Sequence, residues 1–478
     1  MGARCAAVNR DIPYRVGHDD VTSDGSLPSC PVENSEWSVP NPIDHPWRTA
    51  VTAKRTGATA RARDAEPHED GTRRTEILIA AESVLATSGL RTSLQEIADA
   101  CGILPGSLYH HFESKEAILV ELMRRYHADL DRVADAAVEG LDRPDARSAS
   151  DKIVEFGSAI AECAVRNRAA LQMSFFEGPS ANPELTALTQ RRPDKLNDAM
   201  LQTLRAGKWS GYIRSDVDLP VLADRICQSM LHVGLDVIRH NATSGRVASL
   251  LCRILLEGIA SVPASDADLD GSAAFAAVSG VIDSWPEVDV DASDKARHVR
   301  AAARTVFGRR GYEATTARDI AAAAGMATGT VYRLIGSKDE LLVSIMREFG
   351  EKVGAGWEVA LRSDSTVIEK LDALSWINVM ALERFPDEFR IQLAWMRQSP
   401  PDTPNPGWSF TARVRQMKSM LTAGIRSGDI TVDSRSTEML ARCFIGVQWI
   451  PENILRQVGT RRALQLARDT SLRGVVAR

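Results

Sequence analysis

The sequence is poor in aromatic residues and lacks the long apolar runs that mark membrane proteins. Phenylalanine, tryptophan and tyrosine together make up 5% of the 478 residues, and no alternating runs of β-branched residues stand out, so a chain of helices is predicted. No apolar stretch reaches the roughly 18 residues that a membrane-spanning helix needs. The start of the chain also lacks the apolar core of a signal peptide. Neither a membrane protein nor a secreted protein is expected.

The sequence also lacks the signatures of metal sites and of common enzymes. Its seven cysteines form an odd, scattered set without a Cys-x-x-Cys pair, so neither a disulfide framework nor a zinc site is indicated. There is no Gly-rich phosphate loop and no Gly-x-Ser-x-Gly motif, and no pair of carboxylates stands out as acid and base. We therefore expect a soluble cytoplasmic protein that is not an enzyme and that uses neither metal nor cofactor.

One segment of the chain occurs twice. Residues Ile97–Met123 return 223 positions later as Ile320–Met346, and the two copies share 11 of 27 positions without a gap. The shared positions include both glycines, the tyrosine and a Ser-Lys pair. Each copy is typical of a short helix, a tight turn and a second short helix that begins with small and hydroxyl residues. Helices of this kind enter the DNA major groove.

Local signals define the helices of each copy. In the first copy Ser93 begins a capping box, Gly102 turns the chain, and Pro105 suits the first turn of the next helix because its missing N–H has no intrahelical role there. A preceding helix is expected to end at a glycine cap, Gly89 in the first copy and Gly311 in the second. Each copy therefore predicts a three-helix DNA-binding unit.

About 130 residues of helical pattern follow each copy. The most apolar stretches are 221–239 and 247–260 after the first copy, and 436–450 and 461–476 after the second. Residues 263–293, acidic at both ends, separate the halves and contain a short helical pattern from Ala273 to Trp285. Residues 1–70 are rich in Pro, Ser, Asp and Thr and predict a disordered extension, unless the true translation start lies further in.

The order of helix, glycine cap, capped helix, glycine turn and Gly-Ser-Leu-Tyr-His-His-Phe resembles the DNA-binding domain of the TetR family of transcription repressors. The resemblance implies an all-α fold in two tandem repeats, with helical domains that bind a ligand and dimerise through their last two helices. The implied domains are a disordered extension with a basic arm (1–70), a first helix-turn-helix domain (73–123), a first ligand and dimerisation domain (124–262), an acidic linker (263–293), a second helix-turn-helix domain (294–346) and a second ligand and dimerisation domain (347–478).

The same resemblance assigns DNA-contacting residues to both copies. Small and hydroxyl residues at the start of the recognition helix allow close approach to base edges, and the tyrosine, histidine and basic residues reach phosphates. In the first copy these residues are Ser93, Pro105, Gly106, Ser107, Tyr109, His110, His111 and Lys115. In the second copy they are Thr316, Ala327, Thr328, Thr330, Tyr332, Arg333 and Lys338. The sequence identifies no residue that binds the effector.

Charge distinguishes the two copies although the whole chain carries a net charge of −5. Residues 73–118 carry four basic and six acidic side chains, whereas residues 294–340 carry nine basic and five acidic ones. The second copy is therefore expected to dominate the salt-dependent part of DNA affinity. Residues 48–63 carry five basic and no acidic side chains, which is consistent with a basic arm beside the first copy or with a plain solvated tail.

These patterns predict a sequence-specific, ligand-responsive repressor that binds a double-stranded DNA operator and a small apolar effector. Two unlike copies in one chain favour an internal pseudo-dimer on an asymmetric operator over a homodimer of tandem chains. The sequence is also compatible with one copy serving only as a dimerisation scaffold, and with a non-specific architectural DNA-binding protein. Repression, as opposed to activation, follows from the family resemblance alone.

Overall fold

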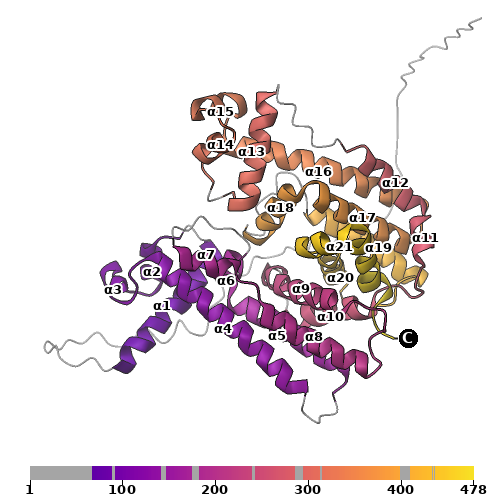
Figure 1. Ribbon diagram of the computed structural model, residues 1–478, viewed down its shortest axis with the longest axis horizontal. Helices are drawn as coiled ribbons and strands as arrows, with labels where there is room; N and C mark the ends of the chain where they lie inside the picture. The colour runs from indigo at the N-terminus through magenta and orange to yellow at the C-terminus, as the bar shows by residue number, and fades with distance from the viewer. Residues whose placement is uncertain are drawn as a thin grey trace, which may run out of the picture. The chain divides into compact units, whose positions relative to one another are not determined.

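The described part of the chain is built of helices (Figure 1). A computed structural model describes residues 67–88, 92–141, 147–174, 182–239, 243–285, 294–312, 315–398, 410–432, 434 and 436–477. Residues 65–478 form one compact unit. The predicted basic arm and the cap at Gly89 lie outside the described residues. Among the described helices, none combines the length and the apolarity that crossing a bilayer requires.

The first half of the compact unit consists of a helix-turn-helix unit followed by a helical body. Helices α1 to α3 form the unit, and α4 to α10 form the body. Their bounds are α1 Pro67–Ser88, α2 Leu94–Ala100, α3 Pro105–His111, α4 Lys115–Leu141, α5 Ala149–Arg166, α6 Arg168–Met173, α7 Pro183–Gln190, α8 Asp194–Trp209, α9 Leu219–Arg239 and α10 Ser244–Glu257.

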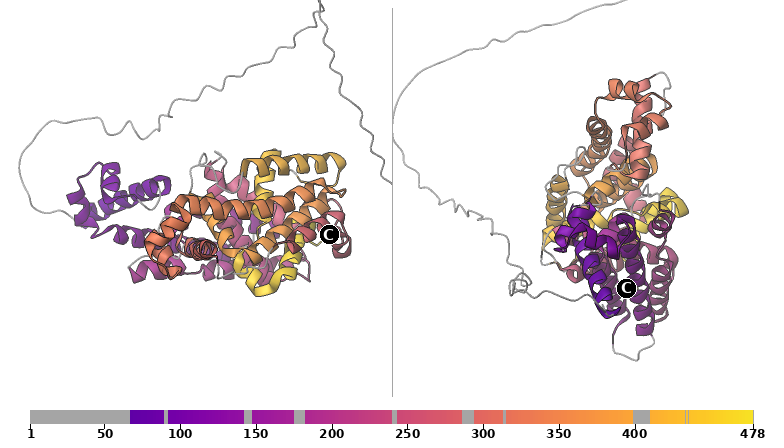
Figure 2. Two further views of the ribbon diagram at one scale, coloured as in Figure 1. Left: turned by 90° about the horizontal axis from the view of Figure 1, so that it is seen from above. Right: turned by 90° about the vertical axis from the view of Figure 1, so that its left-hand side faces the viewer.

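The second half repeats this order with a shorter body. The second half is coloured from orange to yellow in Figure 2. Helices α13 to α15 correspond to α1 to α3, and α16 to α21 form the body, which ends in a π-helical turn, η2. Their bounds are α13 Lys295–Arg310, α14 Ala317–Ala323, α15 Thr328–Ile335, α16 Lys338–Arg362, α17 Val367–Arg384, α18 Pro386–Gln398, α19 Phe410–Ser427, α20 Thr437–Val447, α21 Glu452–Ala467 and η2 Arg468–Arg473. The prediction of an all-α chain in two tandem repeats is confirmed.

The segment expected to be a linker is helical in its described part. It contains α11 (Asp266–Asp270) and α12 (Ala273–Asp283), both capped by serines, and α12 packs against α16 and α17 of the second half. The packing follows from composition, because α12 is almost entirely small or apolar and gains free energy by leaving water. Residues 263–285 are therefore part of the folded body and do not form a free tether.

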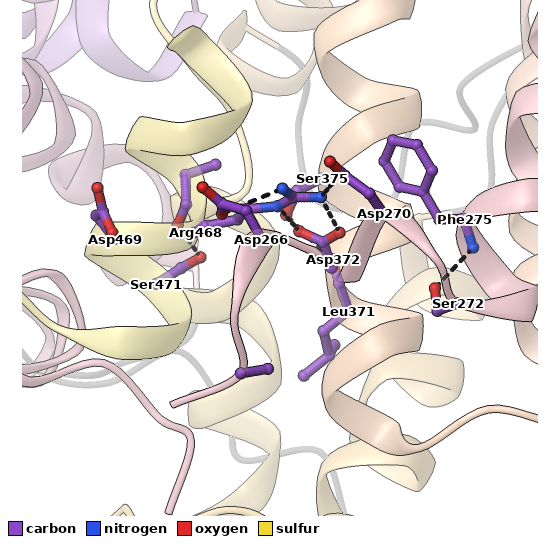
Figure 3. A network of polar contacts seen from close by, with 12 residues as sticks. Asp266, Asp270, Ser272, Phe275, Leu371, Asp372, Ser375, Arg468, Asp469 and Ser471 are labelled. Atoms are coloured by element: carbon purple, nitrogen blue, oxygen red, sulfur yellow. Dashed lines mark hydrogen bonds and ion pairs between the residues drawn. The ribbon is translucent and has the colours of Figure 1, made fainter. Parts of the chain in front are cut away.

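A buried ion-pair network holds this segment to the C-terminal end of the chain (Figure 3). Arg468 of η2 forms a two-point contact with Asp372 of α17, at 2.8 Å for both nitrogen–oxygen pairs, and both side chains are almost fully buried. The same guanidinium reaches Asp270 at 2.7 Å and Asp266 at 3.2 Å on α11. Because a buried charge is tolerated only when it is paired, this network fixes α11, α17 and η2 relative to one another.

The C-terminal prediction was wrong in its boundaries. The apolar pattern indicates a helix over 461–476, but α21 begins at Glu452, directly after Pro451, and bends at Gly459, whose φ is 77° and ψ 167°. The chain then tightens into η2 and leaves helical geometry at Gly474. A pattern of buried residues does not reveal a helical turn whose outward face is polar, and the first turns of α21 are of this kind.

The two halves are joined along the last helices of each. Helix α10 packs against α20 and η2, and α9 contacts α20 and α21. The wholly buried Arg225 of α9 donates from Nη2 to the carbonyl oxygen of Val447 at 2.7 Å, and Gln228 donates to the Asn453 side chain at 2.9 Å. These contacts join the last helices of the two halves, through which the family resemblance implies dimerisation.

Backbone hydrogen bonds continue this junction at the end of the chain. The Val475 N–H donates to the Leu256 carbonyl at 2.6 Å, and the Arg214 N–H donates to the Val475 carbonyl at 2.9 Å. Gly258 and Gly474, both with positive φ, cross here so closely that a Cβ on either would lie well under 3.0 Å from backbone atoms of the other segment. Glycine is therefore required at both positions.

Candidate DNA-binding interface

The first helix-turn-helix unit is assembled by its caps and its core. The Ser93 hydroxyl accepts from the Glu96 N–H at 3.2 Å, and the Glu96 carboxylate accepts from the Ser93 N–H at 2.6 Å. This capping box is as predicted and fixes the start of α2. Ile97, Leu108 and Phe112 are buried between the helices, so the angle between α2 and α3 is set by apolar packing.

Helix α3 presents its polar residues to solvent. Gly106, Ser107, Tyr109 and His110 are exposed, and Tyr109 is 54% exposed. Four predicted contact residues on one open helix face match the geometry that groove binding needs.

The other predicted residues of the first unit are less accessible. Pro105, His111 and Lys115 are half-buried, whereas Ser93 is exposed. The Ser93 hydroxyl also donates to the Glu96 carboxylate at 2.8 Å, so a phosphate there has to compete with the cap. Burial lowers the pKa of Lys115. Ser93 and Lys115 are therefore less available to a phosphate than Tyr109 and His110 are.

The second unit presents a similar face with different chemistry. Tyr332 and Arg333 are exposed, with 51% of Tyr332 free, and Arg333 Nη2 lies 3.3 Å from the Thr330 hydroxyl on the same helix. Ala327 and Thr316 are exposed, whereas Thr328 and Thr330 are half-buried. The half-buried Lys338 places its ammonium 4.1 Å from the Tyr312 ring centroid, and Thr316 caps α14 in a capping box with Asp319.

One exposed residue at the recognition helix was missed by sequence reasoning. Leu104, the N-cap of α3, is 79% exposed and lies in register with Ala327 of the second unit. An apolar side chain at this place is suited to contact with the methyl group of thymine. Alignment of the two copies could have indicated this residue, because Leu104 stands where the second copy has the much smaller Ala327.

Each unit is attached to its body through a polar contact between its first helix and the body. In the first half, the half-buried Glu82 of α1 accepts from the Ala169 N–H of α6 at 2.7 Å, and burial raises the pKa of Glu82 to about 7. In the second half, Arg304 of α13 pairs with Glu388 of α18 at 3.1 Å. The two junctions occupy equivalent places, but the first helix contributes a carboxyl in one and a guanidinium in the other.

A cavity of about 910 Å³ lies between the bodies of the two halves. Its walls come from α4, α7, α8, α9 and α10 of the first half and from α17, α18, α19, α20 and α21 of the second. Among the lining residues, Leu251 belongs to the first half, and Phe389 and Trp449 to the second. Trp449 lines this cavity, and Trp357 is buried in the core. The side chains of Trp395 and Trp408 lie outside the described part.

Comparison with known proteins places these features in one family. Residues 77–122 and 299–345 each match the family model of bacterial regulatory proteins of the tetR family. The HTH-type transcriptional repressor KstR2 of Rhodococcus jostii is 33% identical over 193 residues, which are 40% of this chain and 92% of that protein. The HTH-type transcriptional regulator UidR of Escherichia coli is 29% identical over 147 residues, 30% of this chain and 71% of that protein.

A solved structure of the ketosteroid transcriptional regulator KstR2 of Mycobacterium tuberculosis is 25% identical, with a TM-score of 0.30, over 37% of this chain and 89% of that one. The family model matches both copies of the repeated segment, and the Rhodococcus repressor matches over nearly its whole length. The chain therefore belongs to the TetR family of bacterial DNA-binding transcriptional regulators, and it carries the DNA-binding unit of that family twice.

Proposed function

We propose that this chain is a single-chain repressor whose two unlike helix-turn-helix units bind two different half-sites of one operator. The observation that carries the proposal is the pair of exposed recognition helices with different side chains on one polypeptide. Helix α3 offers Leu104 and His110, whereas α15 offers Ala327 and Arg333 at the same register. Two recognition helices with different side chains prefer different base sequences, so the preferred operator is asymmetric.

The junction between the halves supports an internal pseudo-dimer. Dimeric helix-turn-helix proteins place two recognition helices in successive turns of the major groove. In this chain α9 and α10 contact α20, α21 and η2, which are the elements that a second subunit would otherwise supply. The buried Arg225–Val447 contact and the crossing of Gly258 with Gly474 favour a fixed pairing within one chain over a homodimer of tandem chains.

Exposure supports the proposed phosphate contacts of the recognition helices. Tyr109, His110, Tyr332 and Arg333 are exposed on the recognition helices and are proposed to contact phosphates. Residues at the starts of these helices are proposed to read bases: Pro105, Gly106 and Ser107 in the first unit, and Ala327, Thr328 and Thr330 in the second. His111, Lys115 and Lys338, with the cap residues Ser93 and Thr316, are proposed to hold the DNA backbone at the edges of each unit.

We further propose that the domain boundaries expected from the sequence hold, except that residues 263–285 belong to the folded body. The cavity between the halves is the proposed site of a small apolar effector. An effector weakens operator binding when it binds better to the arrangement of the two halves that cannot reach DNA. By linkage, the operator then weakens effector binding by the same factor.

Selection of bound sequences from a random DNA pool with the full chain tests the operator. The expected result is two unlike half-sites at a fixed spacing. Repeating the selection with Thr328→Ala should relax only the half-site read by the second unit, and Leu104→Ala only the other. A symmetric operator, or a single half-site that responds to one variant alone, would show that one unit serves as a scaffold. Sequences without a fixed register would show a non-specific architectural protein.

Light scattering on the protein–operator complex tests the pairing. An internal pseudo-dimer binds the whole operator with one chain of 52.1 kDa. Two chains per operator at micromolar concentration would instead show a homodimer of tandem chains.

A further inference from the structure

The cavity between the halves has walls from both, which sets it apart from a pocket inside either body. Ser229 of α9 and Val247 of α10 contribute from the first half, and Phe389 of α18 and Gly446 of α20 from the second. A molecule that fills the cavity therefore contacts both halves at once. Because α9, α10 and α20 also form the junction, such a molecule touches the same helices that pair the halves.

The charged side chains of the lining already have charged partners, inside the lining or beside it. Arg390 contacts Glu452, with 2.8 Å between Nε and Oε2, and Arg442 contacts Glu438 at 3.1 Å. His127 lies 2.9 Å from the Leu188 carbonyl, and burial lowers the pKa of its ring, which favours the neutral form. A charged ligand would have to break these pairs, and burying a charge without a partner is costly.

One polar group of the lining stands without a partner. The side-chain oxygen of Asn197 on α8 is buried, and within the described residues it accepts no hydrogen bond. Buried polar atoms are almost always paired. This oxygen is closed off from solvent, so a ligand's donor pairs with it only when the Asn197 side chain turns toward the cavity, whereas an apolar ligand leaves it unsatisfied.

We infer that the cavity takes an uncharged, mainly apolar molecule with a hydroxyl or N–H donor, that this molecule bridges the two halves, and that Asn197 accepts its hydrogen bond. The inference rests on the proposed function, in which the cavity is the effector site, and adds the chemical class of the effector and the place of its donor. Binding across the junction then changes the pairing of the halves and with it the spacing of the two recognition helices.

Three related fluorescent probes test the ligand class on the full chain. N-phenyl-1-naphthylamine is neutral and has one N–H, its N-methyl derivative lacks the donor, and 1-anilinonaphthalene-8-sulfonate adds a negative charge. We expect the first to bind about two- to tenfold more tightly than the second, the worth of one hydrogen bond, and more tightly than the third. Tighter binding of the sulfonate, or equal binding of the two neutral probes, would overturn the assignment.

A double-mutant cycle locates the donor contact. Asn197→Leu removes the acceptor, so it should abolish the preference for the N–H probe over its N-methyl derivative. If the preference survives in this variant, Asn197 is not the acceptor and the inference about it fails.

Two bulky substitutions test the bridging site. Ser229→Trp fills the cavity from the first half and Gly446→Trp from the second, and each should abolish saturable binding of the N–H probe. Gly280→Trp is the matched control, because Gly280 is an exposed helical glycine of α12 with open space around it, outside the lining. If either filling variant leaves half of the binding sites, the halves hold separate pockets and the bridging site is refuted.

Operator binding of the unmodified chain, measured in parallel, separates this inference from the proposed function. If the expected differences in probe binding are not found but the operator is bound, only the inference is overturned. Absence of operator binding overturns the proposed function.

Discussion

The crossing of Gly258 and Gly474 gives the sharpest test of the junction between the halves, through the substitution Gly474→Ala. The backbone at Gly474 has φ 80° and ψ 157°, a region that only glycine enters without strain, and another residue there costs about 1–3 kcal/mol. An added Cβ would also lie well under 3.0 Å from the carbonyl oxygen of Glu257. That oxygen is backbone and cannot rotate away.

Gly459 provides a matched control because it separates strain from collision. Its φ of 77° and ψ of 167° are close to those of Gly474, but a Cβ there would meet nothing within 4 Å. Gly459→Ala should therefore show the strain alone. Gly474→Ala should add the loss of neighbouring backbone hydrogen bonds, such as those of Val475 with Leu256 and Arg214, at about 0.5–1.5 kcal/mol each. The expected difference between the variants is about 1–3 kcal/mol.

Urea denaturation of both variants, with operator binding on intact sites and on single half-sites, measures the effect. Gly474→Ala should be the less stable variant, and its affinity for the whole operator should fall toward that for its stronger half-site, because the halves no longer hold a fixed spacing. Gly459→Ala should keep the advantage of the whole operator. Equal stability of the two variants would refute the close crossing, and an unchanged operator preference in Gly474→Ala would refute its role in pairing the readers.

Three further predictions concern charge. Burial raises the pKa of Glu82 from 4.5 to about 7, so the protonated carboxyl stabilises the fold, and this contribution is lost as the pH rises from about 5 to 8. Glu82→Gln should abolish up to about 3 kcal/mol of this pH dependence of the unfolding free energy. The prediction is contradicted if urea denaturation shows the same loss of stability with pH in the variant and in the unmodified chain. Asp372→Asn leaves the buried Arg468 without its main partner and should cost about 3 kcal/mol of unfolding free energy; a loss below about 1 kcal/mol in calorimetry would show that the network is dispensable. Arg333→Ala should reduce the slope of log operator affinity against log salt concentration by about 1, and Lys115→Ala should reduce it by less. Operator binding measured over a range of salt concentrations tests this. The reverse order would show that the first unit carries more of the phosphate contacts.

The helix-turn-helix units were predictable because their determinants are local. The capping box at Ser93, the turn at Gly102 and the proline at the start of α3 each act within one helical turn of their own position, so the sequence alone indicates them. The structure reproduces all three. The buried positions Ile97 and Leu108 follow from the same helical spacing.

The junction and the cavity were only partly predictable because their determinants are far apart in the chain. The apolar stretches around α9, α10 and α20 indicate surfaces that need partners, and packing among them was expected. No local pattern reveals that Arg225 finds a carbonyl on α20 or that Arg468 pairs with Asp372, nearly a hundred residues earlier. For the same reason, the sequence does not indicate that the side-chain oxygen of Asn197 lacks a hydrogen-bond partner, because its neighbours come from distant parts of the chain.

The contacts that join each helix-turn-helix unit to its body differ between the two halves, which duplication within one chain allows. In a symmetric dimer of identical chains, any change at this junction alters both readers together. Here Glu82 meets a backbone N–H of α6, whereas the equivalent Arg304 meets the carboxylate of Glu388 on α18. The first contact depends on a carboxyl that titrates near pH 7, and the second is an ion pair with a guanidinium that stays charged. One effector at the shared cavity can therefore act on two readers that are held to their bodies by different chemistry.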